Sequence, residues 1–326
     1  MTKYFLKKFI GCIPLLIGIT LVTFLVIHLA PGSAVDAKAS FNPKMTMQAK
    51  ARLESLYGLD RPLVLQYADW MGRLLRFDFG ASFVDGQRVT EKIGKAVPVT
   101  LGINLASLVL ILLFGIPLGI FGAVQKGSAA DKALTAFVFA GFSIPTFWLA
   151  LVLMSFFGVR LGWLPVSGMH SLFYEEMGAG RQWLDVSRHL LLPVFVASFT
   201  GVAGISRYVR SGMIQVLQKP YIRTARAKGL PENKIIYGHA LPNVFLPLIT
   251  ILGLSIPGLL GGSVIFETIF SVPGMGRLFF DSVFTRDYPV IMGILVLGAC
   301  LTLLGNFLAD IFYALADPRI RVEGRS

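Results

Sequence analysis

Six long apolar stretches constrain the fold of this chain of 326 residues. They cover residues 9–29, 97–124, 133–159, 189–205, 244–266 and 290–315, and only the last contains a charged side chain, Asp310. About 20 apolar residues in a helix are enough to cross a hydrocarbon core of about 30 Å. Charged residues make up 15% of the chain, against about 25% in soluble domains. The sequence therefore predicts an all-α polytopic membrane protein with six transmembrane helices.

The first apolar stretch follows Lys3, Lys7 and Lys8, as the core of a secretory signal peptide would. Ala37 and Ala39 add small residues at a cleavage-like spacing. The core of a signal peptide spans about 7 to 15 residues, however, and residues 9–29 exceed that length. We therefore expect a first helix that is retained in the mature protein.

Basic residues are unevenly divided between the segments that join the apolar stretches. With the N-terminus inside, the cytoplasmic segments are the N-terminus, residues 125–132, residues 207–241 and the C-terminus, and they are richer in Lys and Arg than the two short outside loops. Positive charge collects on the cytoplasmic side of membrane proteins, so both termini are predicted to be cytoplasmic. The same rule accounts for the net charge of +12 without nucleic acid as a partner.

The long segment after the first apolar stretch, residues 31–96, is predicted to be an external, folded loop. Apolar residues recur at helical spacing over residues 63–75, directly after Asp60 and Pro62, which favour a helix start. A shorter amphipathic helix is expected over residues 46–57. Two roles remain open at this point: a cap over an external vestibule that contacts a delivery protein, or a helical hairpin on the bilayer surface.

The segment between the fourth and fifth apolar stretches, about 207–243, is the most informative. Pro220 favours a helix start, and Gly229 and Pro231 favour its end. A helix of about eight residues, roughly 12 Å long, is therefore expected between them. A second short helix is expected over residues 232–240, ahead of the next apolar stretch.

The chemistry of this first short helix suits docking in a groove of another protein. Arg223 and Arg226 are three residues apart and share a face. Ala225 and Ala227 keep parts of the helix surface thin, and Gly229 permits a tight turn. The alternative interpretation is a basic helix at the membrane surface that binds anionic headgroups.

The same segment resembles the cytoplasmic loop of the ABC importer permeases, which carries Glu-Ala-Ala, three residues, Gly and later Ile-x-Leu-Pro. Aligned on Gly229, this chain has Arg223-Thr224-Ala225 and His239-Ala240-Leu241-Pro242 at those positions. The departures are similar to the version in the dipeptide, oligopeptide and nickel branch. Further stretches resemble that branch across almost the whole chain: residues 29–36, 57–71, 77–89, 142–153, 160–168, 267–278 and 317–319.

This resemblance implies a fold like that of a type I ABC importer permease and divides the chain into four parts. They are residues 1–30 with the first helix, the external loop 31–96, a five-helix core 97–318 that contains the coupling loop, and a cytoplasmic tail 319–326. The residues implied to couple this chain to an ATPase are Tyr221, Arg223, Thr224, Ala225, Arg226, Ala227, Gly229, Leu230, Leu241 and Pro242.

The resemblance also implies the partners and the location. They are a homologous second permease subunit, two ATPase subunits that use ATP and Mg, an external substrate-binding protein and the lipid bilayer. The implied location is the cytoplasmic (inner) membrane of a prokaryote. The implied function is ATP-driven import, by alternating access, of dipeptides or oligopeptides.

Motifs for catalysis are not found in the sequence. It holds no Gly-x-x-x-x-Gly-Lys-Ser/Thr loop and no His-Glu-x-x-His motif, so we expect a non-catalytic subunit that binds no cofactor or metal of its own. A secondary transporter would show inverted repeats and buried charge relays, and a membrane enzyme would need a reactive cluster. Nickel and other small solutes remain open as alternative substrates of the same machinery.

Overall fold

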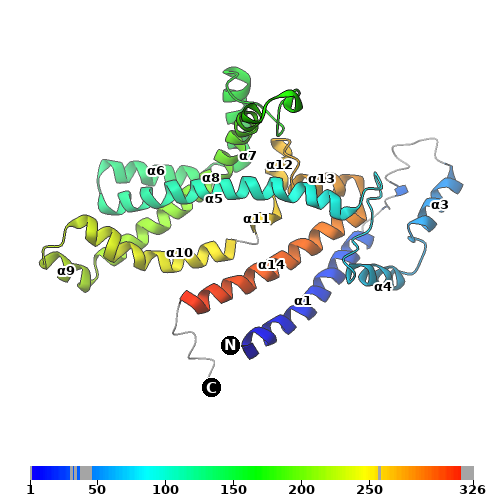
Figure 1. Cartoon of the computed structure of the whole chain (residues 1–326), viewed down its shortest axis with the longest axis horizontal. Helices are drawn as coiled ribbons and strands as arrows, with labels where there is room; N and C mark the ends of the chain where they lie inside the picture. Colours follow the sequence, from blue (N-terminus) through cyan, green and yellow to red (C-terminus); the bar gives the residue numbers. More distant parts are fainter. Residues whose placement is uncertain (1, 30–31, 33–34, 37–45, 256–257, 317–326) are drawn as a thin grey trace.

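The computed structural model describes residues 2–29, 32, 35–36, 46–255 and 258–316, and the predicted tail 319–326 lies outside them. Within these residues the chain is helical and forms no β-strand, only an isolated antiparallel bridge between Ala81 and Arg88. The molecule is elongated, with α9 (Pro220–Ala227) at one end of its long axis and α3 (Met47–Leu56) at the other (Figure 1).

Four unbroken helices are long and apolar enough to cross a membrane: α1 (Thr2–Leu29), α5 (Val89–Val124), α8 (Ala179–Leu217) and α14 (Tyr288–Ala316). Two bent helix pairs pass the same criterion, and counting each as one span gives the predicted six. At 36 and 39 residues, α5 and α8 are longer than the apolar stretches from which they were predicted. Because a span needs only about 20 residues, their polar ends extend past the hydrocarbon core.

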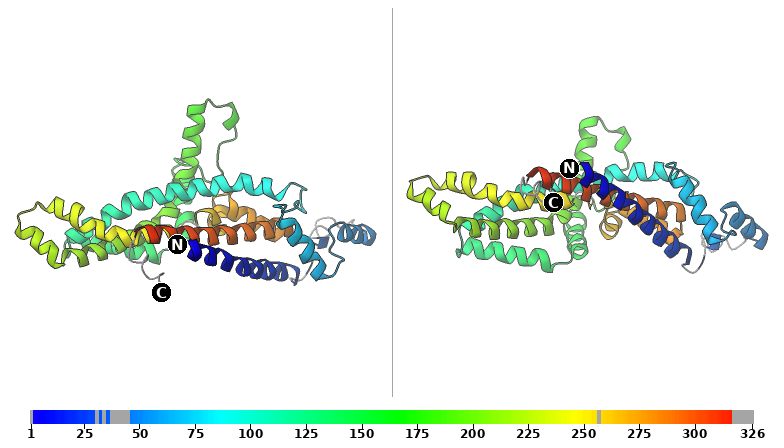
Figure 2. Two further views of the ribbon diagram at one scale, coloured as in Figure 1. Left: turned by 60° about the horizontal axis from the view of Figure 1, so that its bottom comes forward. Right: turned by 90° about the horizontal axis from the view of Figure 1, so that it is seen from below.

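The first bent pair corrects the prediction of one continuous helix over residues 133–159. The chain instead forms α6 (Ala129–Ser143), then α7 (Thr146–Leu153) continued by η1 (Met154–Arg160), with a bend of 101° between them. Pro145 causes the break, because a proline forces the residue before it out of the helical region; Ile144 is extended, with φ −83° and ψ 118°. The arm formed by α7 and η1 projects from the long axis of the molecule (Figures 1 and 2) and packs along one side against the first part of α8.

The predicted span over residues 244–266 also proves to be interrupted. A short π-helical stretch, η3 (Lys234–Ala240), runs into α10 (Leu241–Ser255), which ends well before residue 266. Two short helices follow, α11 (Gly258–Gly261) and α12 (Val264–Ile269), and then α13 (Met275–Thr285). Gly262 separates the two short helices with φ +66°, a backbone conformation that favours glycine.

Close packing of α5 on α8 forms the centre of the bundle. Gly115 and Gly119 of α5 are four residues apart and face α8. A Cβ added at Gly119 would lie 2.7 Å from the backbone oxygen of Ser206, and one at Gly115 would lie 3.0 Å from the side chain of Ile205. Small residues at this spacing let membrane helices approach closely, so these glycines set the distance between the two longest helices.

A buried carboxylate holds the short helices together. Glu267 of α12 is 3% exposed and accepts hydrogen bonds from the hydroxyl of Thr100 at 2.9 Å and from the backbone N–H groups of Gly276 and Arg277 at 2.8 and 3.1 Å. The latter two belong to the first turn of α13, whose N–H groups have no partner within the helix. Glu267 therefore caps α13 and ties it to α5.

The segment after α1 is folded, as predicted, and contains α3 and α4 (Leu63–Leu74). Trp70 of α4 is buried against Phe24 of α1 and Tyr288, Ile291 and Met292 of α14. Through these contacts α4 rests on the ends of the two helices.

A second buried carboxylate fastens the chain between α4 and α5. Asp287 is 1% exposed and accepts hydrogen bonds from the hydroxyl of Ser82 and from the backbone N–H of Phe83 at 2.9 Å. The ammonium group of Lys92 lies 3.8 Å from the same carboxylate. These contacts join residues 82–85 to the start of α14.

Replacing Asp287 with Ala should loosen this segment. The change leaves the Ser82 hydroxyl and the Phe83 N–H without their acceptor, and hydrogen bonds to charged groups contribute about 1.5–3 kcal/mol each. We expect faster proteolytic cleavage within residues 76–88 and a lower thermal midpoint in detergent. Asp281→Ala is the matched control, because that side chain is 61% exposed; equal behaviour of the two variants would contradict the assignment.

Candidate functional site

The predicted docking helix is present as α9, Pro220–Ala227. Pro220 occupies the first helical position, where its missing N–H is not needed and its fixed φ suits the helix. Lys219 before it is extended, with ψ 148°, so the helix begins sharply after α8.

The helix ends at Gly229 in a Schellman motif. Gly229 has φ +75°, its N–H donates to the Arg226 carbonyl at 2.9 Å, and the Leu230 N–H donates to the Ala225 carbonyl at 3.3 Å. This pair of bonds satisfies two carbonyls at the helix end and requires a residue that tolerates positive φ. A Cβ at position 229 would meet nothing within 4 Å, so the glycine is needed for its backbone conformation rather than for space.

One face of α9 packs against the rest of the chain. Ile222 is fully buried and Ala225 is 8% exposed, and both join a core cluster with Val209 and Met213 of α8 and Ile235 of η3. The small side chain of Ala225, which was predicted to keep part of the helix surface thin, points into this cluster. The cluster fixes α9 to the end of α8.

The opposite face of α9 is open to solvent in the isolated chain. The exposed residues there include Tyr221, Arg223, Thr224, Ala227 and Lys228. The Thr224 hydroxyl donates to the Pro220 carbonyl at 3.2 Å. Arg223 and Lys228 have no side-chain partner among the residues that the structure describes, so both cations are available to a partner.

Arg226 is exposed but already paired. Its guanidinium donates to the carboxylate of Glu232 at 2.7 and 3.2 Å, across the turn at Gly229. This hydrogen-bonded pair lowers the pKa of Glu232. The pair's contribution is therefore complete above the ordinary glutamate pKa, about 4.3, and is lost only as the pH falls through the lowered value. The pairing thus persists throughout the neutral range.

The remaining predicted residues lie where the loop meets the next helices. Leu230 and Leu241 are partly buried against the same core cluster as Ile222, whereas Pro242 is exposed in the first turn of α10. The second predicted helix, residues 232–240, is present as η3, and its Ile235 and Ile236 are buried in the cluster. The structure therefore joins the ten predicted residues in one compact unit, with some turned inward and others outward.

An ion pair between α8 and α6, which the sequence did not predict, stabilises the end of the molecule that carries α9. Arg210 of α8 donates two hydrogen bonds, at 2.6 and 2.8 Å, to the carboxylate of Asp131 in the first turn of α6. Asp131 is 4% exposed and also accepts the Gly127 N–H at 2.9 Å. The two residues are 79 positions apart, and no local pattern connects them.

Replacing Arg210 with Ala should destabilise the α9 end of the molecule. It leaves the Asp131 carboxylate buried without its counter-ion, which typically costs about 3–5 kcal/mol. We expect a clear fall in the thermal midpoint of Arg210→Ala and a partial rescue when Asp131→Asn is added, because the neutral amide needs no counter-ion. A midpoint unchanged by Arg210→Ala would contradict this role, and Arg207→Ala on the same helix serves as control.

The helix bundle and the loop that contains α9 together define the class of protein. An all-helical membrane bundle holds a short, rigid helix at one end, with buried and exposed faces clearly separated, and this is the architecture of a type I importer permease. A movement imposed on the exposed face of α9 would be passed to α8 through the Ile222 cluster, because packed side chains move as a unit.

Comparison with known proteins supports this assignment to the importer permeases. Residues 115–322 match the family of the binding-protein-dependent transport system inner membrane component, and residues 1–104 match the N-terminal family of such membrane components. The chain belongs to this family and is a multi-pass inner-membrane protein. It is 42% identical to the oligopeptide transport system permease protein AppB of Bacillus subtilis, with 98% of this chain and 99% of that protein covered. It is 39% identical to the di/tripeptide transport system permease protein DppB of Pseudomonas aeruginosa, with 98% and 99% covered.

A similar fold occurs in solved structures of the MetNI methionine ABC transporter in inward-facing conformations. The match has a TM-score of 0.53 and 18% identity, and it covers 69% of this chain and 96% of that one. At this identity the match shows the fold alone.

Proposed function

We propose that this chain is a permease subunit of an ATP-driven importer that moves dipeptides or oligopeptides across the cytoplasmic membrane by alternating access. The observation that carries the proposal is α9, a short helix fixed to the bundle by Ile222 and Ala225 with its cationic face uncovered. The substrate class follows from the names of the relatives, which are 39–42% identical along almost their whole length.

In this proposal α9 and both termini are cytoplasmic, and α9 docks in a groove of one ATPase subunit. Two ATPase subunits bind and hydrolyse ATP with Mg, and this chain contributes no catalytic group. A nucleotide can shift the access of the pore only through different affinities for the two states. Closure of the ATPases would displace α9, and the Ile222 cluster would carry that displacement into α8 and α5.

The arm formed by α7 and η1 supports a homologous second permease as a further partner. It leaves the bundle at 101°, and several of its large apolar side chains are exposed: Phe147, Trp148, Leu151, Phe156 and Val159. Large exposed apolar side chains gathered on one short arm mark a protein or membrane contact. The segment containing α3 and α4, at the opposite end from α9, is proposed to meet the external substrate-binding protein (Figure 1).

Reconstitution tests the proposal directly. The chain is placed in liposomes with its second permease and ATPase subunits, and uptake of a labelled tripeptide is followed with the binding protein outside. Uptake should require ATP, Mg and the binding protein together. Uptake that proceeds without ATP, driven by a proton or sodium gradient, would refute the proposal.

A further inference from the structure

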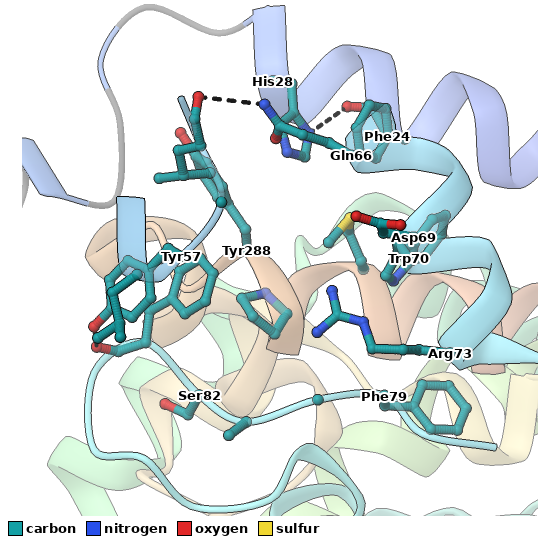
Figure 3. A pocket seen from close by; sticks show the side chains of 18 of the residues that line it. Phe24, His28, Tyr57, Gln66, Asp69, Trp70, Arg73, Phe79, Ser82 and Tyr288 are labelled. Carbon is teal, nitrogen blue, oxygen red and sulfur yellow. Dashed lines mark hydrogen bonds between the residues drawn. The ribbon is translucent and has the colours of Figure 1, made fainter. Parts of the chain in front are cut away.

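A cavity of about 920 Å³ lies at the end of the molecule opposite α9. Its walls come from α4, from the chain before and after it (residues 55–61 and 79–86), and from the ends of α1 and α14. Figure 3 shows side chains from all of these parts turned toward one space. Ligand sites are typically concave spaces of about 300–1,000 Å³ with apolar walls and few polar groups, so this cavity has the size of a small-molecule site.

Aromatic rings form its fixed walls. Phe24 and Trp70 are buried, at 2% and 5% exposure, with ring centroids 6.1 Å apart. On another wall the rings of Tyr57 and Phe83 stack with centroids 4.1 Å apart. Tyr288 is held in place because its hydroxyl donates to the Gly32 carbonyl at 2.9 Å. These rings are packed before any ligand arrives, so little ordering is required on binding.

The charges that line the cavity pair off, with one exception. Arg61 pairs with Asp69 at 3.1 Å. Asp85 pairs with Lys92 at 2.8 Å, and although burial opposes it, this pairing lowers the pKa of Asp85. Arg73 has no side-chain partner among the residues that the structure describes, and its guanidinium projects from α4 into the cavity (Figure 3).

An unpaired guanidinium beside aromatic walls favours a ligand that carries both a carboxylate and an apolar group. Its planar fork of N–H donors matches a carboxylate in a bidentate arrangement, and the rings suit an apolar or aromatic side chain. A short peptide offers both on its last residue, a free carboxylate and a side chain. A protein segment offers a free carboxylate only at its own C-terminus or on an acidic side chain, and the concave shape favours the small molecule.

We infer that this cavity is a binding site, at which short peptides are held by their C-terminal carboxylate on Arg73 with the last side chain against the partly exposed rings of Tyr57 and Phe83. The peptide class rests on the proposed function. The site is separate from α9, at the end where substrate would arrive, and it retains peptide close to the bundle before passage.

Binding of Ala-Ala-Phe and of its C-terminal amide to the purified permease complex in nanodiscs, with no binding protein present, tests the inference. The free acid should bind at least about tenfold more tightly than the amide, since a charge-assisted bidentate contact is lost. Arg73→Ala should lower the affinity for the acid to that for the amide, and Arg73→Lys should restore part of it. Arg76→Ala is the control, an exposed arginine that does not line the cavity.

Equal affinities for acid and amide would overturn the inference, and so would acid binding that is unchanged in Arg73→Ala. Val84→Cys introduces an exposed cysteine in the cavity wall and keeps Arg73. Protection of this cysteine from labelling by the external binding protein but not by peptide would also overturn the inference, because the occupant would then be a protein segment. Tripeptide uptake is measured in parallel. Acid-selective binding without ATP-driven uptake would refute the proposed function alone, whereas uptake without acid-selective binding would refute the site alone.

Discussion

Reversing both free charges on α9, with Arg223→Glu and Lys228→Glu together, should abolish ATP-driven uptake in a chain that still folds and inserts. Both side chains are exposed and have no side-chain partner in the described part of the chain, so their replacement breaks no internal contact. At an interface, charges of the wrong sign cost several kcal/mol. We expect ATPase subunits to bind at least about 30-fold more weakly, a loss of about 2 kcal/mol at an interface charge pair.

The measurement is co-purification of the ATPase subunits together with uptake in proteoliposomes. Lys132→Glu is the matched control, an exposed lysine in the first turn of α6 that receives the same charge change outside α9. The control should retain uptake. If the double variant kept full uptake and full ATPase binding, the uncovered face of α9 would not be the docking surface.

Gly276→Ala should prevent stable folding of the region around α12 and α13. A Cβ at Gly276 would lie 2.5 Å from the carbonyl carbon of Ser263 and 2.6 Å from the nitrogen of Val264. Both are backbone atoms, which cannot move aside as a flexible side chain could. The clash would also displace the Gly276 N–H from Glu267 and leave a buried carboxylate short of a donor, which costs about 1–3 kcal/mol in addition to the steric strain.

Gly298→Ala in α14 makes the matched comparison, because a Cβ there meets nothing within 4 Å. Alanine is the better helix former by about 1 kcal/mol, so this variant should be as stable as the parent or slightly more so. Thermal unfolding in detergent should separate the two variants by many degrees. Similar midpoints for Gly276→Ala and Gly298→Ala would contradict the close approach of α12 and α13.

Local signals in the sequence predicted the elements on which the function depends. Pro220 and Gly229 bound α9 because one fixes a starting φ and the other supplies a positive φ, and both effects act within a few residues. The helix over residues 63–74 was predicted in the same way. The apolar stretches predicted the number of spans but not their breaks. Pro145 and Gly262 interrupt two of these stretches. A break of this kind does not change the hydropathy of the stretch, so hydropathy could not predict it.

Partners that are distant in sequence could not be predicted. Asp131 meets Arg210, and Glu267 meets Thr100 and the start of α13, only because packing of α5 and α8 fixes where these segments lie. The orientation of Ala225 could not be predicted for a similar reason: the sequence of an eight-residue helix does not show which of its faces the rest of the chain covers. The contact that does show it, Ile222 against α8, is made only in the folded structure.

Side-specific cysteine labelling tests the proposed docking of α9 most directly, because cytoplasmic ATPase subunits can reach α9 only if it lies on the cytoplasmic side. In a chain with Cys12 and Cys300 replaced by serine, a single cysteine is introduced by Arg223→Cys or by Gln87→Cys near the opposite end. With a membrane-impermeant maleimide, Arg223→Cys should react in inside-out vesicles and stay unlabelled in right-side-out vesicles, and Gln87→Cys should show the reverse. Labelling of Arg223→Cys in right-side-out vesicles would contradict the account.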